Sequence, residues 1–340
     1  MKRKVVIVTN KLSEGAGADE LDVLEQADMV ANACEKLGYE VARMEMGLDL
    51  QSAISRIREE HPEMLFNLVE SLDNKGEFAF IAASVFSSLG IPYSGTPVIP
   101  MFLASNKVLA KRELVRLGLP TPKWFGADEA ALLDPRKRYI LKPIWEEGSL
   151  DLDESSVFYG TDERMKETAA SKSREHYFIE EYIEGREFNI SILGGLDGPE
   201  VLPLAEMQFL DFPAGKPKIL GYRSKWEEES FEYTHTTRTF QSGEQDRVLH
   251  LRLIELCEAC WKGFGLKGYV RIDFRVTKEG EPLIIDINAN PCLSHSGGFA
   301  AALEQAGYSF TEAIRRILAD AVGSGQWAVG SRQLAVGSRQ

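Results

Sequence analysis

Strand and helix signals alternate through the first 95 residues, and this alternation constrains the fold more than any other feature of the chain. The pattern predicts strands over 5–9, 39–46 and 64–70, and helices over 19–37, 50–60 and 77–89. Short connections between alternating strands and helices are typical of a parallel sheet with helices on both faces. We therefore predict an α/β, doubly wound domain at the N-terminus. Ligands of such sheets bind beyond the carboxyl ends of the strands, so the loops at 10–20 and 67–77 are candidate site loops.

The rest of the chain mixes its elements differently, which predicts an α+β arrangement in the C-terminal part. Residues 101–185 combine helical stretches with the strand signals RYILKPIW, SVFYG and HYFIEEYIEG. Residues 186–322 are richer in strands, which a helix over 246–265 divides. We place three domains at 1–100, 101–185 and 186–322. Residues 323–340 continue a seven-residue repeat of AVGS with few large apolar groups, which predicts a disordered tail, with a binding tail as the alternative.

Composition excludes several classes of partner. The formal net charge is −13, and lysine and arginine are scattered along the chain, so we expect no binding to nucleic acid. No apolar run reaches the 18 residues that suggest a membrane span, and the basic start MKRK leads into a strand rather than a signal peptide, so we expect a cytoplasmic protein. Cys257 and Cys260 form a C-x-x-C pair without a second ligand pair, and helical periodicity favours thiols packed in a core over a zinc site.

Polar residues alternate along two neighbouring strands near the C-terminus, VRIDF and IIDIN. If the two strands pair, Asp273, Asp286 and Asn288 converge on one face, because strand residues two apart share a face. Two carboxylates and an amide oxygen suit Mg²⁺, which leaves its other positions to water and phosphate oxygens. Arg271 on the same face adds a fixed positive charge beside such phosphates. The alternative is a solvent-facing strand surface with ordinary ion pairs.

Two lysines and an acidic segment extend this pattern. Lys142 ends the apolar strand YILKP, where a lysine favours an anionic partner, although a side chain that snorkels to solvent is the alternative. Lys107 lies near a helix start in ASNKVLAK. In FIEEYIEGREF, the carboxylates of Glu180, Glu181 and Glu187 are placed to take a pair of ribose hydroxyls, and the main chain of such a strand end can bind an adenine edge.

This set of motifs resembles the ATP-grasp superfamily and, within it, D-Ala-D-Ala ligase. The resemblance covers residues 1–320 and is carried by SNK, LKP followed by EEGS, FIEEYIEGREFNISIL, VRIDF, and DINANP followed by SHS, in the family's order. It implies an ATP-grasp fold with an N-terminal doubly wound pre-ATP-grasp domain. ATP is then expected between the central and C-terminal domains.

The resemblance also implies a role for each matched residue. Phosphates and nucleoside of ATP are assigned to Lys107, Lys142, Glu180, Glu181, Ile183 and Glu187. Magnesium is assigned to Asp273, Asp286 and Asn288. Catalytic roles are assigned to Arg271, Lys225 and Ser149. Substrate contacts are assigned to Glu25, Trp226, Ser296 and Gly297.

The implied reaction is ATP-dependent ligation of a carboxylate to an amine through an acyl phosphate. The implied cofactors are ATP and two Mg²⁺ ions, with Mn²⁺ as a substitute. The implied partners are amino-acid-like small molecules, together with a second copy of the chain in a homodimer. The alternatives are an ATP-grasp ligase of another amino acid or natural product, a phosphotransferase with a non-carboxylate acceptor, and an ATP-binding module without turnover.

The chain departs from the ligase pattern mainly on the substrate side. Residues 146–154 carry five carboxylates where the ligases have a loop rich in glycine and serine. Trp226 replaces a tyrosine, and Cys292 replaces a glycine. The N-terminal glutamate of the ligases has three candidates here, Glu20, Asp22 and Glu25, of which Glu25 is assigned above.

Overall fold

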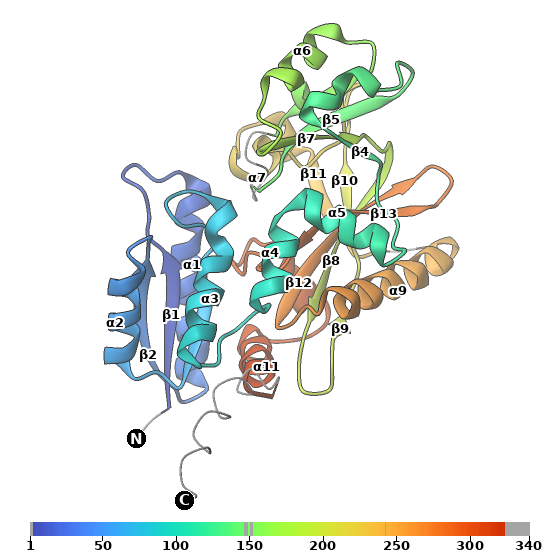
Figure 1. Ribbon diagram of the computed structural model, residues 1–340. Helices are drawn as coiled ribbons and strands as arrows, with labels where there is room; N and C mark the ends of the chain where they lie inside the picture. Colours follow the sequence, from blue (N-terminus) through green and yellow to red (C-terminus); the bar gives the residue numbers. More distant parts are fainter. Residues whose placement is uncertain (1–2, 146–148, 150–151, 242, 324–340) are drawn as a thin grey trace, which may run out of the picture.

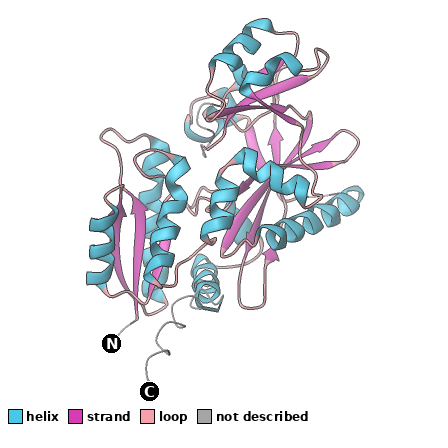
Figure 2. Ribbon diagram, viewed as in Figure 1, coloured by secondary structure: helices cyan, strands magenta, loops and turns pink. Residues whose placement is uncertain are grey.

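The structure is a computed structural model that describes residues 3–145, 149, 152–241 and 243–323. Three β-sheets organise the described chain, each with its own helices (Figure 1). The N-terminal sheet lies to one side of the other two, and several helices lie between it and the other sheets (Figure 2). None of the described helices is long and apolar enough to cross a membrane.

The N-terminal sheet is parallel, with the strand order β2-β1-β3. Its elements are β1 (Lys4–Asn10), α1 (Ala18–Lys36), β2 (Glu40–Met46), α2 (Leu50–Glu60), β3 (Met64–Leu68), the 3₁₀ turn η1 (Gly76–Phe78) and α3 (Ala79–Leu89). Alternate residues of β1 face opposite layers: Val5 and Ile7 pack with α1, whereas Val6 and Val8 pack with α2 and α3. The predicted parallel sheet with helices on both faces is confirmed.

The second sheet is antiparallel, with the strand order β4-β7-β5-β6. Its elements are β4 (Trp124–Gly126), η2 (Ala127–Leu132), β5 (Arg138–Pro143), η3 (Glu154–Ser156), β6 (Val157–Tyr159), α6 (Glu163–Ser171) and β7 (Tyr177–Glu181). Apolar residues of α6 and η2 cover one face of this small sheet. The strands around RYILKP and YFIEE are as predicted, whereas β4 is an additional short edge strand.

The third sheet has the order β11-β10-β8-β12-β13, with β9 also paired to β8. Its strands are β8 (Gly185–Leu193), β9 (Glu200–Val201), β10 (Ala205–Phe209), β11 (Thr236–Thr239), β12 (Tyr269–Thr277) and β13 (Pro282–Asn288). The helices of this region are α7 (Arg223–Trp226), α8 (Phe231–Thr234), η4 (Glu244–Asp246), α9 (Arg247–Phe264), α10 (Gly298–Gln305) and α11 (Phe310–Gly323). Cys257 and Cys260 of α9 are free thiols in the core against this sheet, as the helical periodicity indicated.

Helices α4 (Val98–Ser105) and α5 (Lys107–Arg116) follow the N-terminal sheet. Their apolar residues, such as Met101 and Leu114, join the core between α9 and the third sheet. These helices therefore carry Lys107 to the edge of the third sheet. The boundaries at residues 100, 185 and 322 stay a prediction. The predicted disordered tail lies outside the described residues beyond Gly323.

Candidate active site

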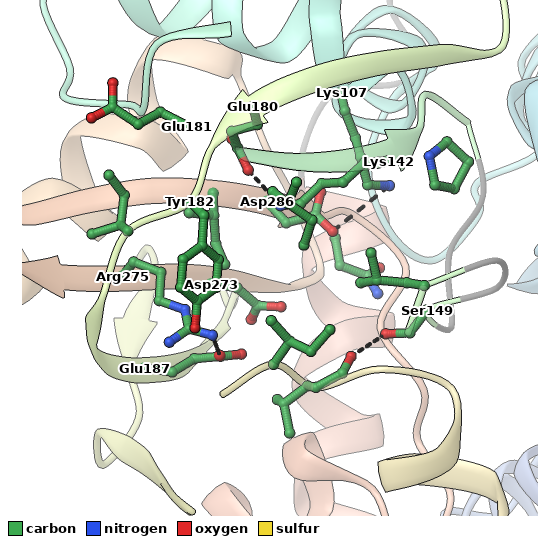
Figure 3. A pocket seen from close by; sticks show the side chains of 18 of the residues that line it. Lys107, Lys142, Ser149, Glu180, Glu181, Tyr182, Glu187, Asp273, Arg275 and Asp286 are labelled. Atoms are coloured by element: carbon green, nitrogen blue, oxygen red, sulfur yellow. Dashed lines mark hydrogen bonds and ion pairs between the residues drawn. The ribbon is translucent and has the colours of Figure 1, made fainter. Parts of the chain in front are cut away.

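A cavity of about 110 Å³ lies between the second and third sheets (Figure 3). Its walls come from β5 and β7 on one side and from β8, β12 and β13 on the other. Every residue that the sequence assigned to ATP, metal or catalysis lines it: Lys107, Lys142, Ser149, Glu180, Glu181, Ile183, Glu187, Lys225, Arg271, Asp273, Asp286 and Asn288. Segments far apart in the chain therefore meet at one site.

Strand pairing brings the polar residues of β12 and β13 together. The two strands are antiparallel, and their register sets Asp273 opposite Asp286 and Arg271 opposite Asn288. Directly opposed side chains on one face have Cβ atoms about 5 Å apart. The Arg271 guanidinium donates to both oxygens of Asp273, from Nε at 2.8 Å and from Nη2 at 2.9 Å. The sheet itself therefore fixes this cluster, rather than a mobile loop.

The donor set fits Mg²⁺. The described residues include no group of three or more histidine, cysteine, aspartate or glutamate side chains that could hold a metal. Asp273 and Asp286 with the Asn288 amide oxygen instead form a small hard-oxygen set, which suits an ion that keeps water and phosphate oxygens as further ligands. Burial opposes ionisation of Asp286, but nearby cations, with Lys107 the strongest, lower its pKa below the usual value. Asp286 is thus held as the carboxylate that a metal needs.

A buried cluster of charges stands beside the carboxylate pair. Lys142 of β5 contacts the Glu180 carboxylate of β7 with 2.5 Å between Nζ and Oε2. Lys111 of α5 pairs with the same carboxylate, and both partners are 2% exposed. Burial raises the pKa of Glu180, but the two lysines outweigh it and lower the pKa overall. Sequence reasoning missed Lys111, although its spacing of four residues from Lys107 places both lysines on one helix face.

The remaining nucleotide candidates lie along the same cavity. Glu187 of β8 is buried and pairs with Arg275 of β12, with 2.8 Å between Oε2 and Nη2. Burial raises the pKa of Glu187. Glu181 pairs instead with Lys137 at 2.6 Å, and its carboxylate points away from the centre of the cavity (Figure 3). Arg275 continues the alternation of Arg271 and Asp273 on the same strand face, but the sequence analysis assigned it no role.

Two further segments line the smaller cavity, one with Ser149 after β5 and the other with Leu220 and Lys225. Ser149 donates from Oγ to the carbonyl of Leu220 at 2.6 Å, which ties the loop after β5 to the segment that leads into α7. Lys225 of α7 lines the cavity, and burial, reinforced by Arg271, lowers its pKa to about 8. Most of the acidic loop that the sequence singled out, including Glu146, Glu147 and Asp151, lies outside the described residues.

A second, larger cavity of about 710 Å³ adjoins the first. Lys225, Arg271 and Asn288 line both cavities, so the two meet at these side chains. The predicted substrate residues Trp226, Ser296 and Gly297 line the larger cavity. This cavity has a size typical of small-molecule sites, which measure roughly 300–1,000 Å³.

Glu25 is the one predicted site residue that lines neither cavity. Its Oε1 accepts a hydrogen bond from the backbone N–H of His295 at 3.1 Å. The other two candidates, Glu20 and Asp22, line the larger cavity instead. Glu25 lies three residues beyond Asp22 on α1, which is close to one full turn further along the helix axis. This displacement along the axis accounts for Asp22 lining the cavity while Glu25 does not.

Sequence reasoning also missed residues of the larger cavity. Arg238 of β11 donates to the backbone carbonyls of Gly297 at 3.0 Å and Ser296 at 3.2 Å. Burial, together with the charge of Arg271, lowers the pKa of Arg238. Asp19 of α1, which also lines the larger cavity, accepts a hydrogen bond at 3.3 Å from the hydroxyl of Tyr222, so the segment that leads into α7 contacts α1. The short polar segment around β11 has no apolar pattern by which Arg238 could be found.

Comparisons with known proteins find similarity to D-alanine–D-alanine ligases. The profile of a family described as D-ala D-ala ligase C-terminus matches residues 161–319. The chain is 27% identical to a D-alanine–D-alanine ligase of Aquifex aeolicus over 89% of this chain and 97% of that protein. It is 26% identical to the uncharacterized protein y4sG of Sinorhizobium fredii over 86% of each chain.

Solved structures share the fold at low sequence identity. D-alanyl-alanine synthetase A of Vibrio cholerae has a TM-score of 0.74 and 17% identity, over 95% of this chain and 99% of that one. A D-alanine–D-alanine ligase of Bacillus anthracis, solved in complex with ATP, has a TM-score of 0.69 and 18% identity, over 94% of this chain and 97% of that one.

The family profile, the curated relatives and the shared fold together support an ATP-grasp-like protein. Its sheets and helices agree with the α/β fold class expected from the sequence, and the solved ligases share this fold. Within that superfamily the chain is D-Ala-D-Ala ligase-like.

Proposed function

We propose that the protein is an ATP-dependent ligase that joins the carboxylate of one amino-acid-like substrate to the amine of another. The observation that carries this proposal is the register of β12 and β13, which places Asp273 beside Asp286 and Arg271 beside Asn288 where two cavities meet. The lining of the smaller cavity offers the cations and carboxylates that a nucleotide and its metal need, and the larger cavity has the size of a small-molecule site. The curated ligases that the chain resembles also support this assignment.

The smaller cavity is lined by side chains that can bind a polyphosphate. Lys107 and Lys142 are the proposed ligands of its phosphate oxygens, because both line the smaller cavity and Lys107 Nζ lies 3.8 Å from Asp286 Oδ2. Glu187 is the proposed partner of the ribose hydroxyls, and Ile183 and Glu181 are the proposed main-chain contacts of the adenine. Asp273, Asp286 and Asn288 would hold Mg²⁺, with two ions proposed and Mn²⁺ as a substitute. The metal supplies charge neutralisation at phosphate oxygens.

The protein's part in the reaction is positioning and charge stabilisation. A substrate carboxylate attacks the γ-phosphate, which yields ADP and an acyl phosphate. The amine of the second substrate then attacks the acyl carbon, and phosphate leaves as the amide forms. Arg271 and Lys225 line both cavities and so can stabilise the oxyanion that develops between them. Ser149 would fix the loop that covers the phosphates.

The identity of the substrates is the finer part of the proposal. Ser296, Gly297 and the missed Arg238 are proposed to hold the carboxylate of the second substrate. Trp226 and Cys292 stand on the cavity wall where the ligases carry a tyrosine and a glycine, so a substrate other than D-alanine fits the proposal equally well. We also propose a cytoplasmic homodimer, following the ligases that it resembles.

The test is release of ADP and phosphate with Mg²⁺-ATP against a panel of D- and L-amino acids, with mass spectrometry of the products. Formation of D-Ala-D-Ala would assign the reaction of the named relatives, and a different amide would keep the mechanism and change the substrate. A phosphorylated product without an amide would indicate phosphotransfer. ATP binding without ADP release would refute the ligase and leave a binding module.

A further inference from the structure

Arg275 of β12 and Glu187 of β8 form a buried ion pair in the wall of the smaller cavity. The antiparallel register sets the two residues directly opposite each other, and both side chains are 5% exposed. Figure 3 shows the pair beside Tyr182. Arg275 lies two residues beyond Asp273 on the same strand face, which is about 7 Å further along β12. A single ligand can therefore extend from the metal candidate Asp273 to Glu187.

The Arg275 guanidinium joins two further segments to β12. Its Nη2 lies 2.8 Å from Oε2 of Glu187 and donates to the backbone carbonyl of Lys218. Its Nη1 donates to the carbonyl of Gly185 at 3.4 Å. The start of β8 and the segment that leads into α7 are therefore held against β12 by one side chain.

The same side chain supports Tyr182, which also lines the cavity. The Cζ atom of Arg275 lies 5.7 Å from the centre of the Tyr182 ring, within the range of a cation–π contact. The Tyr182 hydroxyl accepts a hydrogen bond from the backbone N–H of Lys218 at 3.0 Å. Tyr182 stands between Glu181 and Ile183, the proposed contacts of the adenine. Arg275 thus supports the part of the cavity that is proposed to hold the nucleoside.

The ion pair fixes which oxygen of Glu187 a ligand can reach. Oε2 is buried against Arg275, so Oε1 is the oxygen that remains for a ligand of the cavity. A carboxyl oxygen in a buried wall can accept a hydrogen bond from a hydroxyl group of the ligand. A ligand without that hydroxyl leaves the oxygen unpaired, which is costly because the oxygen is shielded from water.

We propose that Arg275 is a positioning residue that makes the nucleotide site select a ribonucleotide over a deoxyribonucleotide. It acts through Glu187, whose carboxyl group it holds in the orientation that accepts a ribose hydroxyl. This inference rests on the proposed ATP site and identifies the residue that determines the preference for the sugar.

A contribution to stability alone would be the ordinary explanation of such a pair. However, a buried ion pair stabilises a fold little, or not at all, relative to apolar side chains of similar volume. The charges of Arg275 and Glu187 therefore need a further reason, and their place in the cavity wall supplies it.

Arg186 offers a comparison in the same sheet. It precedes Glu187 on β8, so its side chain lies on the opposite face of the strand. There it pairs with Glu206 and Asp246 at 2.6 Å each, and it lines neither of the two cavities described above. Arg186 is therefore a matched control for the loss of a paired arginine.

Calorimetric titrations with Mg²⁺ and without an amino acid compare ADP with its two analogues that each lack one ribose hydroxyl. We expect the full-length protein to bind ADP roughly 10- to 100-fold more tightly than the analogue that lacks the hydroxyl bound by Glu187, the usual effect of a hydrogen bond to a charged group. Arg275→Met should reduce this ratio toward one. Arg275→Lys should keep part of it, because lysine keeps the charge but not the planar guanidinium. Arg186→Met should leave the ratio unchanged.

Circular dichroism checks that each variant is folded, and Arg275→Gln, which keeps a donor for the Lys218 carbonyl, takes the place of Arg275→Met if methionine prevents folding. A ratio in this variant like that of the unchanged protein, even with weaker binding of all three nucleotides, would mean a structural role only and would overturn the inference. Equal binding of the three nucleotides by the unchanged protein would also overturn it and leave the ATP site intact. If none of the three binds, the ATP site itself fails and the inference fails with it.

Discussion

Replacing the buried Lys111 by methionine should destabilise the protein and weaken its contact with ATP. Lys111 lies on α5 against the third sheet, and its partner Glu180 lies on β7 of the second sheet. The pair therefore links the two sheets that enclose the smaller cavity. Methionine keeps an unbranched chain of similar length but removes the charge and leaves Thr121 Oγ1 without its donor.

The expected loss follows from the burial of both partners. Removing one member of a buried pair typically costs about 3–5 kcal/mol, because the other charge is left behind. Glu180 here keeps Lys142, so we expect a loss of about 2–3 kcal/mol in the free energy of unfolding. Urea unfolding at neutral pH measures it. The double variant Lys111→Met with Glu180→Gln should recover part of the loss, since no uncompensated carboxylate then remains.

An exposed pair provides the control. Lys278 and Glu184 are 3.2 Å apart, and their side chains are 73% and 50% exposed. Lys278→Met should cost less than about 1 kcal/mol. Lys111→Met should also raise the KM for ATP, because Glu180 then has only Lys142 as a partner and holds it more tightly. If Lys111→Met lowers the free energy of unfolding no more than Lys278→Met does and leaves the KM for ATP unchanged, the role given to the Lys111–Glu180 pair is refuted.

Three further predictions concern metal binding, charge and close packing. Asp286→Ala should abolish turnover while circular dichroism stays unchanged, and activity like that of the unchanged protein would remove Asp286 from the metal site. The pKa of Lys225 is lowered to about 8, so its positive charge is lost as pH rises through 8; kcat/KM should fall above that pH, and Lys225→Arg should move the fall to higher pH. Gly268→Ala should lower the melting temperature more than Gly280→Ala: both glycines have positive φ, but only at Gly268 would a Cβ meet backbone, at 2.7 Å from the Cα of Gly95. Equal effects of the two substitutions would contradict that contact.

Local pattern explains which features could be predicted from the sequence. The apolar runs of β1 and β3 and the alternation in β12 and β13 are patterns of consecutive residues. Strand geometry therefore predicts on which face of the sheet each of their side chains lies. The convergence of Asp273 and Asp286 then follows from the short turn between the two strands. The same reasoning could not find β4 or β11, because each is a short edge strand that pairs with a single neighbour.

Contacts between distant segments explain what the sequence could not predict. Cys292 meets Asp22 across 270 positions of the chain, and Gln26 meets Glu70 across 44. No local pattern predicts such a contact, so the sequence could not indicate that Asp22 rather than Glu25 lines the larger cavity. The segment from 210 to 235 is held by charged contacts, such as those of Lys216 with Glu154 and Glu232, and by ring contacts such as that of Phe212 with Phe231. Its short helices are consequently without a periodic signal.

The charges that line the smaller cavity predict that ATP binding depends on Mg²⁺. Its described lining carries five cations, Lys107, Lys142, Lys225, Arg271 and Arg275, and five carboxylates, Glu180, Glu181, Glu187, Asp273 and Asp286. Several of these charges are already paired with each other, so the lining offers a triphosphate little net attraction. Divalent cations placed between the carboxylates and the phosphates would change that balance.

We therefore expect Mg²⁺ to raise the affinity for a non-hydrolysable ATP analogue by at least about tenfold in calorimetric titrations. AMP, which lacks the terminal phosphates, should bind with an affinity that depends much less on Mg²⁺. Asp273→Asn and Asp286→Asn should each reduce the effect of the metal, because each removes one of the charges that attract it. Equal affinity for the ATP analogue with and without Mg²⁺ would mean that the protein's own lysines neutralise the phosphates, and the carboxylate pair would then lose its role as a metal site.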